Sequence, residues 1–387
     1  MERKNAWNTY GKREISELEE LNSNYIDFLS DCKTERESIK EAIYLAESKG
    51  YRNLKNVISA GKSLKAGDKV YYNNMDKSLA LFLIGSESIE SGMRIIGSHV
   101  DSPRLDLKPN PLYEDSELSL METHYYGGVK KYQWVTIPLA LHGVVVKKDC
   151  IKIDVVVGEE ETDPVVMVSD LLVHLASEQQ QKKATEVIAG EDLNILVGSM
   201  PLEGEEKEAV KANILKLLKE KYDFEEEDFM SAEIEIVPAG KARDLGLDRS
   251  MVAGYGHDDR ICAYTSLLAL LETESTKKTS VVLLVDKEEV GSIGATGMQS
   301  RFFENAVAEL MDRVGEYSEL KLRRALANSK MLSSDVTAAF DPNYAGAYEK
   351  KNSAFFGKGL AFAKYTGARG KSGCNDANAE FVAWLRN

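Results

Sequence analysis

The sequence predicts an α/β fold in which a sheet domain, formed by residues 1–106 and 239–387, is interrupted by a β-rich domain at residues 107–238. Three observations predict it. An uninterrupted apolar run at residues 281–285 is typical of a strand covered on both faces, as in a parallel sheet. Helical spacing of apolar residues over 13–49 predicts amphipathic helices that would cover such a sheet. Between these segments, successive short strands indicate a separate, mostly β region.

The first part of the sheet domain leads to a strand that ends in polar residues. After the helices, residues 69–74 and 77–85 predict two strands joined by a short turn. They are followed by an apolar strand over residues 93–101, which runs into His99 and Asp101. This strand would belong to the same sheet as the run at 281–285.

The sequence pattern changes after Pro103, just before the predicted insertion at 107–238, and Pro109 and Pro111 are expected to break the chain. Apolar alternation and helical spacing then predict, in order, strands at 118–128, 134–146 and 150–158, helices at 169–184 and 205–223, and a strand at 231–238. Downstream, residues 261–272 predict a helix, and the last ten residues also have a helical pattern.

Composition limits the classes of function. A chain of 387 residues with 43% apolar and 29% charged residues is typical of a globular protein. The net charge of -14 argues against binding to nucleic acid or to an anionic membrane. No apolar run reaches the roughly 18 to 20 residues that a membrane span needs. The four cysteines are far apart without zinc-site spacing, so we expect a reduced, cytoplasmic protein.

Acidic residues follow the predicted strands where a site is expected. Glu288 and Glu289 come directly after the run at 281–285, and ligands in parallel sheets collect at the carboxyl ends of strands. Two neighbouring carboxylates repel each other unless a metal or a shared proton compensates. In the same setting, His99 and Asp101 follow one strand. Because positions i and i+2 of a strand point the same way, the imidazole could bind a metal while Asp101 orients it.

Two further acidic segments complete the set. Asp258 and Asp259 directly precede the predicted helix at 261–272, and Asp335 ends another apolar segment. Each group also has a simpler interpretation. His99 could be satisfied by a nearby acid without a metal, and Asp258 could be a helix N-cap.

The acid pair at 288–289 could likewise be a solvated turn, and Asp335 a loop acid. Together, however, hard oxygen ligands and one imidazole suit zinc, cobalt or manganese, and a shared carboxylate can bridge two ions. Two such ions can activate a water and polarise a carbonyl, while a free glutamate moves the proton. The constellation therefore predicts hydrolysis of a peptide or amide.

Four ordered motifs resemble those of the aspartyl aminopeptidase family of two-zinc exopeptidases, in particular its bacterial members. The similarity extends from near Thr34 to the segment KSGCNDANAE, nearly the whole chain. The motifs are GSHVDSPRLDLKPNP, GYGHDDRICAYTSLLALL, DKEEVGSIGATG and SSDVTAAFDPNY. The resemblance implies a metalloaminopeptidase with a three-layer α/β/α catalytic domain and a β-rich inserted domain that builds the dimer interface. It also implies peptide substrates and a homo-oligomer, often dodecameric.

The same resemblance implies a role for each candidate residue. His99, Asp258 and Asp335 would bind the first of two zinc ions, and Asp258 would bridge to the second, which Glu289 would also bind. Cobalt or manganese could replace zinc. Glu288 would be the general base. Asp101 would orient the imidazole.

The sequence departs from the family pattern in one respect. The family supplies a further histidine to the second metal from a Ser-Met-His-Ser type motif, and none of the five histidines here lies after His257. The second ion would then keep only Asp258 and Glu289 as protein ligands. This motivates an alternative, a catalytically impaired truncated relative or assembly subunit that binds at most one metal. A metal-dependent deacylase acting on other amides is a third hypothesis.

Three further residues are candidates for contact with the substrate. Arg369 and Lys371 are candidates for binding an acidic substrate side chain, although such glycine-rich basic loops are more often solvated turns. His174 could reach a neighbouring subunit's active site, as a histidine does in some relatives. The alternative is an ordinary helix-face histidine.

Overall fold

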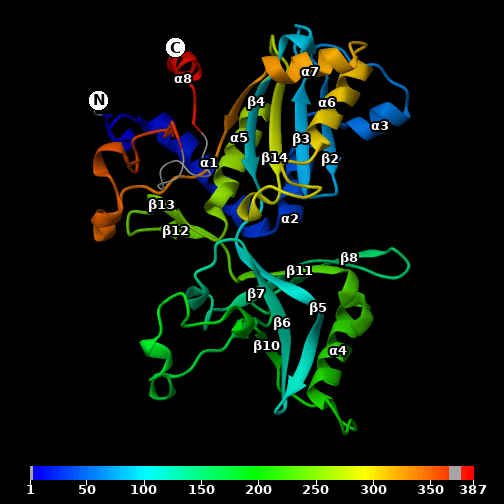
Figure 1. Ribbon diagram of the computed structural model, residues 1–387, viewed down its shortest axis with the longest axis vertical. Coiled ribbons are helices and arrows are strands. Elements are labelled where there is room, and N and C mark those ends of the chain that lie inside the picture. Colours follow the sequence, from blue (N-terminus) through cyan, green and yellow to red (C-terminus); the bar gives the residue numbers. More distant parts are fainter. Residues whose placement is uncertain (1–2, 366–375) are drawn as a thin grey trace. The chain divides into compact units, whose positions relative to one another are not determined.

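The computed structural model describes residues 3–365 and 376–387 (Figure 1). The chain divides into two compact units. The larger unit is Asn22–Asp335, and the smaller unit combines Met1–Leu21 with Val336–Asn387. Within the described ranges, no helix combines the length and the apolar character needed to cross a membrane.

The larger unit contains a six-stranded sheet with the order β1-β2-β3-β14-β4-β15. Its strands are β1 (Arg52–Asn53), β2 (Lys69–Asn74), β3 (Ser78–Leu83), β4 (Arg94–His99), β14 (Ser280–Val285) and β15 (Lys330–Ser333). Both β14 and β15 run parallel to β4, whereas β3 is antiparallel to β14. The carboxyl ends of β4, β14 and β15 therefore lie at one edge of the sheet, and each strand ends at or just before predicted site residues.

Helices cover both faces of this sheet, as the apolar run predicted. In β14, Val281, Leu283 and Val285 pack with α3, α6 and α7, whereas Val282 and Leu284 pack with α2 and α5 (Figure 1). These helices are α2 (Glu35–Ser48), α3 (Leu54–Ser59), α5 (His257–Leu271), α6 (Phe302–Arg313) and α7 (Glu319–Asn328). Helix α1 (Lys12–Asp31) packs instead on Tyr264 of α5. Because alternate side chains of β14 pack into two different apolar cores, the carboxyl end of the strand and the acid pair after it are held in place.

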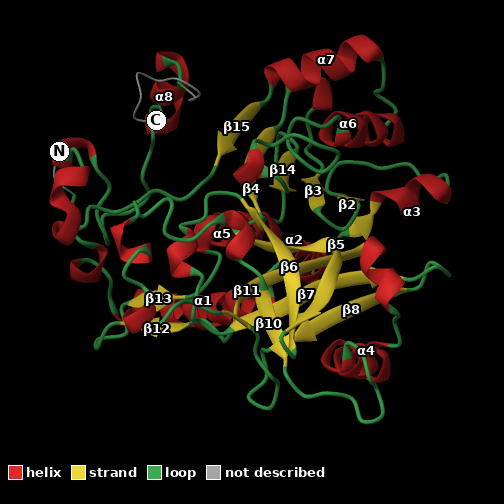
Figure 2. Cartoon of the chain, turned by 60° about the horizontal axis from the view of Figure 1, so that its bottom comes forward, coloured by secondary structure: helices red, strands yellow, loops and turns green. Residues whose placement is uncertain are grey.

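A second, seven-stranded sheet has the order β8-β7-β11-β5-β6-β10-β9 (Figure 2). Its strands are β5 (Arg104–Asp115), β6 (Leu118–Tyr126), β7 (Leu139–Val146), β8 (Lys152–Val157), β9 (Met167–Val168), β10 (Ile195–Gly198) and β11 (Ala232–Pro238). Helix α4 (Ala209–Tyr222) packs on it, and β12 (Arg243–Leu245) pairs with β13 (Met251–Ala253) in a separate hairpin. The division into a catalytic domain and an inserted dimerisation domain stays a prediction.

Two predictions for the segment 107–238 were wrong, and the first concerns the prolines of β5. Pro109 and Pro111 do not break the chain, because both lie inside β5. The pairing of β5 with β6 is irregular between Leu107 and Leu112, so the prolines fall where no ladder hydrogen bond needs their missing N–H.

The segment 169–184 was predicted to be a helix and forms only short 3-10 turns. Its large apolar side chains at 171–173 and 175 are exposed. A helix gains most of its stability from packing an apolar face, and this segment has no such packing. The ten 3-10 helices of the described chain are Ala6–Asn8, Ile89–Ser91, Lys131–Gln133, Val173–Leu175, Gln179–Gln181, Gly190–Asp192, Glu226–Ser231, Glu288–Val290, Pro342–Ala347 and Lys350–Asn352.

The smaller unit has little regular structure. Its C-terminal helix α8 (Ala379–Arg386) begins after Asn378, whose side chain accepts a hydrogen bond from the N–H of Phe381, so the predicted helix is confirmed. An aromatic group forms around Phe340, whose ring centroid lies 5.6 Å from that of Tyr348. None of the predicted metal ligands belongs to this unit.

Candidate metal centre

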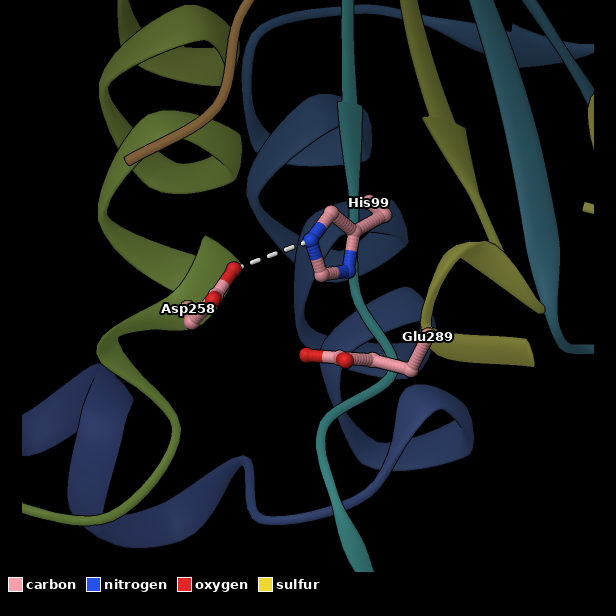
Figure 3. A group of neighbouring side chains, drawn as sticks. All are labelled: His99, Asp258 and Glu289. Atoms are coloured by element: carbon pink, nitrogen blue, oxygen red, sulfur yellow. Dashed lines mark hydrogen bonds and ion pairs between the residues drawn. The ribbon is translucent and has the colours of Figure 1, made fainter. Parts of the chain in front are cut away.

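His99 is the last residue of β4 and is almost fully buried. Its Nε2 lies 3.0 Å from Oδ1 of Asp258 (Figure 3). Its Nδ1 lies 2.9 Å from the backbone carbonyl oxygen of Asp101 and 3.2 Å from Oδ1 of the same residue. Burial by itself lowers the pKa of His99, but the hydrogen bonds to Asp101 and Asp258 outweigh burial and raise it to about 11. Without a metal, the imidazole is therefore protonated between two carboxylates.

Asp101 organises the residues around the imidazole. It is fully buried and its carboxylate accepts a hydrogen bond from the hydroxyl of Tyr126 at 2.7 Å. It also accepts from the backbone N–H groups of Glu288 at 3.1 Å and Glu289 at 3.2 Å. Burial opposes ionisation, yet the contact with His99 and these donors hold the pKa of Asp101 below its usual range. One carboxylate thus joins the end of β4 to the acidic turn after β14.

Asp258 lies at the start of α5, which follows Gly256. It has non-helical backbone angles, the peptide bond to Asp259 is cis, and no side chain caps this helix. The N-cap interpretation of Asp258 is therefore wrong. Its half-exposed carboxylate is directed instead at the imidazole of His99.

Asp259, to which the sequence alone gave no role, is fully buried next to the site. Burial, together with Asp335 and Asp258, raises its pKa to about 7, although Cys262 and His99 oppose the shift. Its position directly after Asp258 was the sequence signal that could have singled it out.

The acid pair forms a 3-10 turn, Glu288–Val290, after Lys287 in a left-handed conformation. The two side chains join different groups, because a carboxylate oxygen of Glu289 lies close to ligand atoms of His99 and Asp258, while Glu288 lies close to Asp335. The side chain of Glu289 extends below the imidazole toward the side on which Asp258 lies (Figure 3). Burial, and then the charge of Asp258, raise the pKa of Glu289 to about 7. Burial also raises the pKa of Glu288.

Asp335 reaches the same place from a third strand. The N–H of Ser334 donates to the carbonyl oxygen of Gly97 at 2.7 Å, which continues the pairing of β15 with β4. This places Oδ1 of Asp335 at 3.9 Å from Nε2 of His99, and Oε2 of Glu288 lies at 3.8 Å from the same nitrogen. All of the residues predicted from the strand and helix ends are therefore brought together.

These residues fit a divalent cation. Three sets of residues could each hold an ion, because the ligand atoms within each set lie within 4.8 Å of one another. The sets are His99 with Asp258 and Glu289, His99 with Glu288 and Asp335, and Asp258 with Asp259 and Asp335. Two ligands of one tetrahedral zinc at ~2.1 Å lie roughly 3.4 Å apart, close to the spacing of His99 and Asp258. Burial first, and then the charges of neighbouring carboxylates, raise the pKa of Asp259 and Glu289, and a bound cation would favour their ionised forms.

The remaining sequence candidates lie elsewhere. His174 is in an exposed 3-10 turn, Val173–Leu175, rather than on a helix face. Arg369 and Lys371 lie outside the described residues. Tyr126, which contacts Asp101, was missed, since its role depends on a contact between the two sheets that no local pattern indicates.

Comparison with known proteins identifies the family of this chain. The sequence matches the family described as "Aminopeptidase I zinc metalloprotease (M18)" over residues 28–387. It is 64% identical over 386 residues to a probable M18 family aminopeptidase 1 of Clostridium acetobutylicum, covering 100% of this chain and 83% of that protein. The crystal structure of an M18 family aminopeptidase from Thermotoga maritima, 44% identical, matches with a TM-score of 0.94 over 100% of this chain and 84% of that one.

A more distant solved structure has a similar fold. The dodecameric aminopeptidase of Saccharomyces cerevisiae is 22% identical and matches with a TM-score of 0.69 over 88% of this chain and 76% of that one. The predicted mixed α/β metallopeptidase fold is thereby confirmed. The chain belongs to the M18 family of aminopeptidases, which are zinc metallopeptidases.

Proposed function

We propose that this chain is a metal-dependent aminopeptidase that removes single N-terminal residues from peptides with a two-metal site. The observation that carries the proposal is the gathering of one imidazole and several carboxylates at the carboxyl edge of the first sheet. The assigned roles are first-metal ligands His99, Asp258 and Asp335, bridging ligand Asp258, second-metal ligand Glu289, general base Glu288 and imidazole-orienting Asp101.

The residues divide the chemical work. Bound zinc would supply the positive charge that polarises the scissile carbonyl and acidifies a water. Glu288 would take a proton from the attacking water and pass it to the leaving amine. Burial raises the pKa of Glu288, which brings its basicity closer to neutral pH, where a general base works best. Asp101 holds the ring of His99 through Nδ1, so that Nε2 is the nitrogen directed at the ligand cluster.

The Glu288→Gln variant tests the assignment of the base. The amide keeps the shape of the side chain but cannot accept a proton, so we expect turnover to fall by about 100- to 10,000-fold with bound zinc unchanged. The measurements are hydrolysis of aminoacyl chromogenic substrates and elemental analysis of the same samples. The exposed Glu274→Gln is the matched control and should behave as wild type. Normal turnover in Glu288→Gln would remove Glu288 from this role.

The substrate class is tested by the N-terminal amine. An aminopeptidase should cleave peptides with a free amine and reject the same peptides after N-acetylation. A metal-dependent deacylase would show the opposite preference. The same panel, run with added zinc, cobalt or manganese, measures which ions support turnover.

A second candidate is a catalytically impaired relative that binds at most one metal. It is favoured by one observation: among the described residues, the groups that could hold an ion contain a single histidine, His99. Metal stoichiometry separates the two functions. Two ions per chain with turnover support the aminopeptidase, and one ion or none without turnover supports the impaired relative.

We further propose a cytoplasmic homo-oligomer based on dimers and reaching a dodecamer. The dodecameric yeast structure supports the assembly, and the three described cysteines, all free thiols, suit a reducing compartment. Exposed apolar side chains at Leu171, Leu172, Val173 and Leu175 in the second-sheet region are suited to an interface. Light scattering after size exclusion measures the mass, and a monomer at micromolar concentration would refute the proposal.

A further inference from the structure

One residue of the second sheet reaches the metal centre of the first. Tyr126 is the last residue of β6, and its side chain is buried. Its hydroxyl donates to Oδ2 of Asp101 at 2.7 Å, across the junction between the sheets. None of the roles assigned above includes this tyrosine.

The hydrogen bond from Tyr126 determines how Asp101 can turn. Oδ2 is shared between the phenol and the N–H of Glu289, while Oδ1 receives the N–H of Glu288 and lies 3.2 Å from Nδ1 of His99. A rotation of the carboxylate toward Tyr126 or away from it would change the distance from Oδ1 to the imidazole. The phenol and the two backbone N–H groups together therefore hold the orientation of the carboxylate that faces Nδ1 of His99, a nitrogen that also lies 2.9 Å from the backbone carbonyl oxygen of Asp101.

Tyr126 is itself held firmly. The guanidinium carbon of Arg104 lies 3.9 Å from the centroid of its ring, and Nζ of Lys287 lies 5.2 Å from the same centroid. Arg104 is buried and anchored by carboxylates, with Nε 2.8 Å from Oδ1 of Asp106 and 3.2 Å from Oε2 of Glu235. Cations near an aromatic ring are attracted to it, so the ring has little freedom to leave Asp101.

The next residue brings the backbone of the second sheet against the acid turn. Gly127 has φ of 75°, and a Cβ atom there would lie 3.2 Å from Cβ of Glu289. Tyr126 thus contacts Asp101, and a side chain at position 127 would press on Glu289. The end of β6 is a support for the metal centre as well as the end of a strand.

We propose that Tyr126 is a positioning residue of the metal centre, whose hydroxyl fixes Asp101 and, through Asp101, the imidazole of His99. The second sheet thereby sets the metal affinity of a site built on the first. This inference rests on the proposed metal-binding function. It adds to that function a support residue whose effect on metal affinity is measurable without any turnover.

The test is Tyr126→Phe, which keeps the ring over Arg104 and removes only the hydroxyl. A residue that hydrogen-bonds to a metal-binding histidine typically contributes 10- to 100-fold in metal affinity. Tyr126 bonds to such a residue, Asp101, instead of to the histidine itself, so we expect zinc affinity to fall about tenfold. Affinity is measured by competition with a chromogenic chelator. At saturating zinc, kcat should fall while KM stays within about twofold, because the hydroxyl is bonded to Asp101.

Tyr71→Phe is the matched control. Tyr71 is also buried, and its hydroxyl donates to Oε1 of Glu47 at 2.6 Å, so the same phenol-to-carboxylate bond is removed in β2. Melting temperatures of both variants are measured with a chelator present. The expected result is a comparable loss of stability in the two variants and a loss of zinc affinity in Tyr126→Phe alone. Equal zinc affinity of Tyr126→Phe and wild type would overturn the proposal.

A double-mutant cycle tests the route through Asp101. In an Asp101→Ala background, Tyr126→Phe should change zinc affinity by less than about twofold, since the side chain that it positions is gone. A full tenfold effect in that background would overturn the route. Should wild type bind zinc without cleaving any peptide, the aminopeptidase proposal fails, while the zinc affinities still decide the role of Tyr126.

Discussion

Filling the metal centre should release about 1.5 protons per chain at pH 7, which follows from the pKa values of the metal-free residues. The pKa of His99 is raised to about 11, so at pH 7 its imidazole holds a full extra proton. The pKa of Glu289 is raised to about 7, so it is half protonated. A metal binds only the deprotonated forms, and both protons must leave. Asp259, with a pKa of about 7, would add up to half a proton if it also ionises.

The pH dependence of affinity follows with its sign. Zinc competes with protons, so affinity rises with pH. Between pH 7 and pH 6 the proton on His99 lowers affinity about tenfold and that on Glu289 about fivefold, which gives a combined fall of about 50-fold. Below pH 6 both groups are fully protonated, and the fall should approach about 100-fold per pH unit.

Calorimetry in buffers of different ionisation enthalpy counts the released protons directly. Glu289→Gln is the control, because it removes the half proton of this side chain while His99 remains. Its proton release at pH 7 should therefore be lower than that of wild type by about 0.5. Zinc binding with no proton release at pH 7 would refute the reasoning, since it would mean that His99 is neutral in the metal-free protein.

Three further predictions concern support and stability. Gly127→Ala should destabilise the protein by roughly 1–2 kcal/mol through its left-handed φ and lower the zinc content by displacing Glu289; urea unfolding and elemental analysis that match wild type would contradict this. Leu283 of β14 is fully buried, so Leu283→Ala should lower the free energy of unfolding in urea by about 2–5 kcal/mol. A loss below about 1 kcal/mol would show that the core can close around the gap. The pKa of His142 is raised because hydrogen bonds to two glutamates outweigh burial, so its stabilisation is full below about pH 6.5 and lost as pH rises through the raised value. The stability difference between wild type and His142→Gln should therefore shrink above about pH 6.5, and a difference that grows with pH would contradict the sign.

Much of the fold could be predicted because local pattern and tertiary environment agree. The run at 281–285 is apolar at every position since β14 has a core on each face, and the strand before His99 was found in the same way. The helix predicted at 169–184 was wrong, because apolar spacing alone does not provide a surface to pack on. The prolines of β5 were misjudged because only the pairing register shows that their missing donors are not needed.

By itself, the sequence determined the kinds of atoms available to the site and the strand or helix end that carries each of them. It did so because strand ends and acidic pairs are local features, readable without knowing which strands are neighbours. Only the tertiary structure decided that His99, Asp258, Glu289 and Asp335 share one place, since the order β14-β4-β15 joins segments far apart in the chain. It also decided the contact of Tyr126 with Asp101, because that hydrogen bond depends on how the end of one sheet meets the edge of the other.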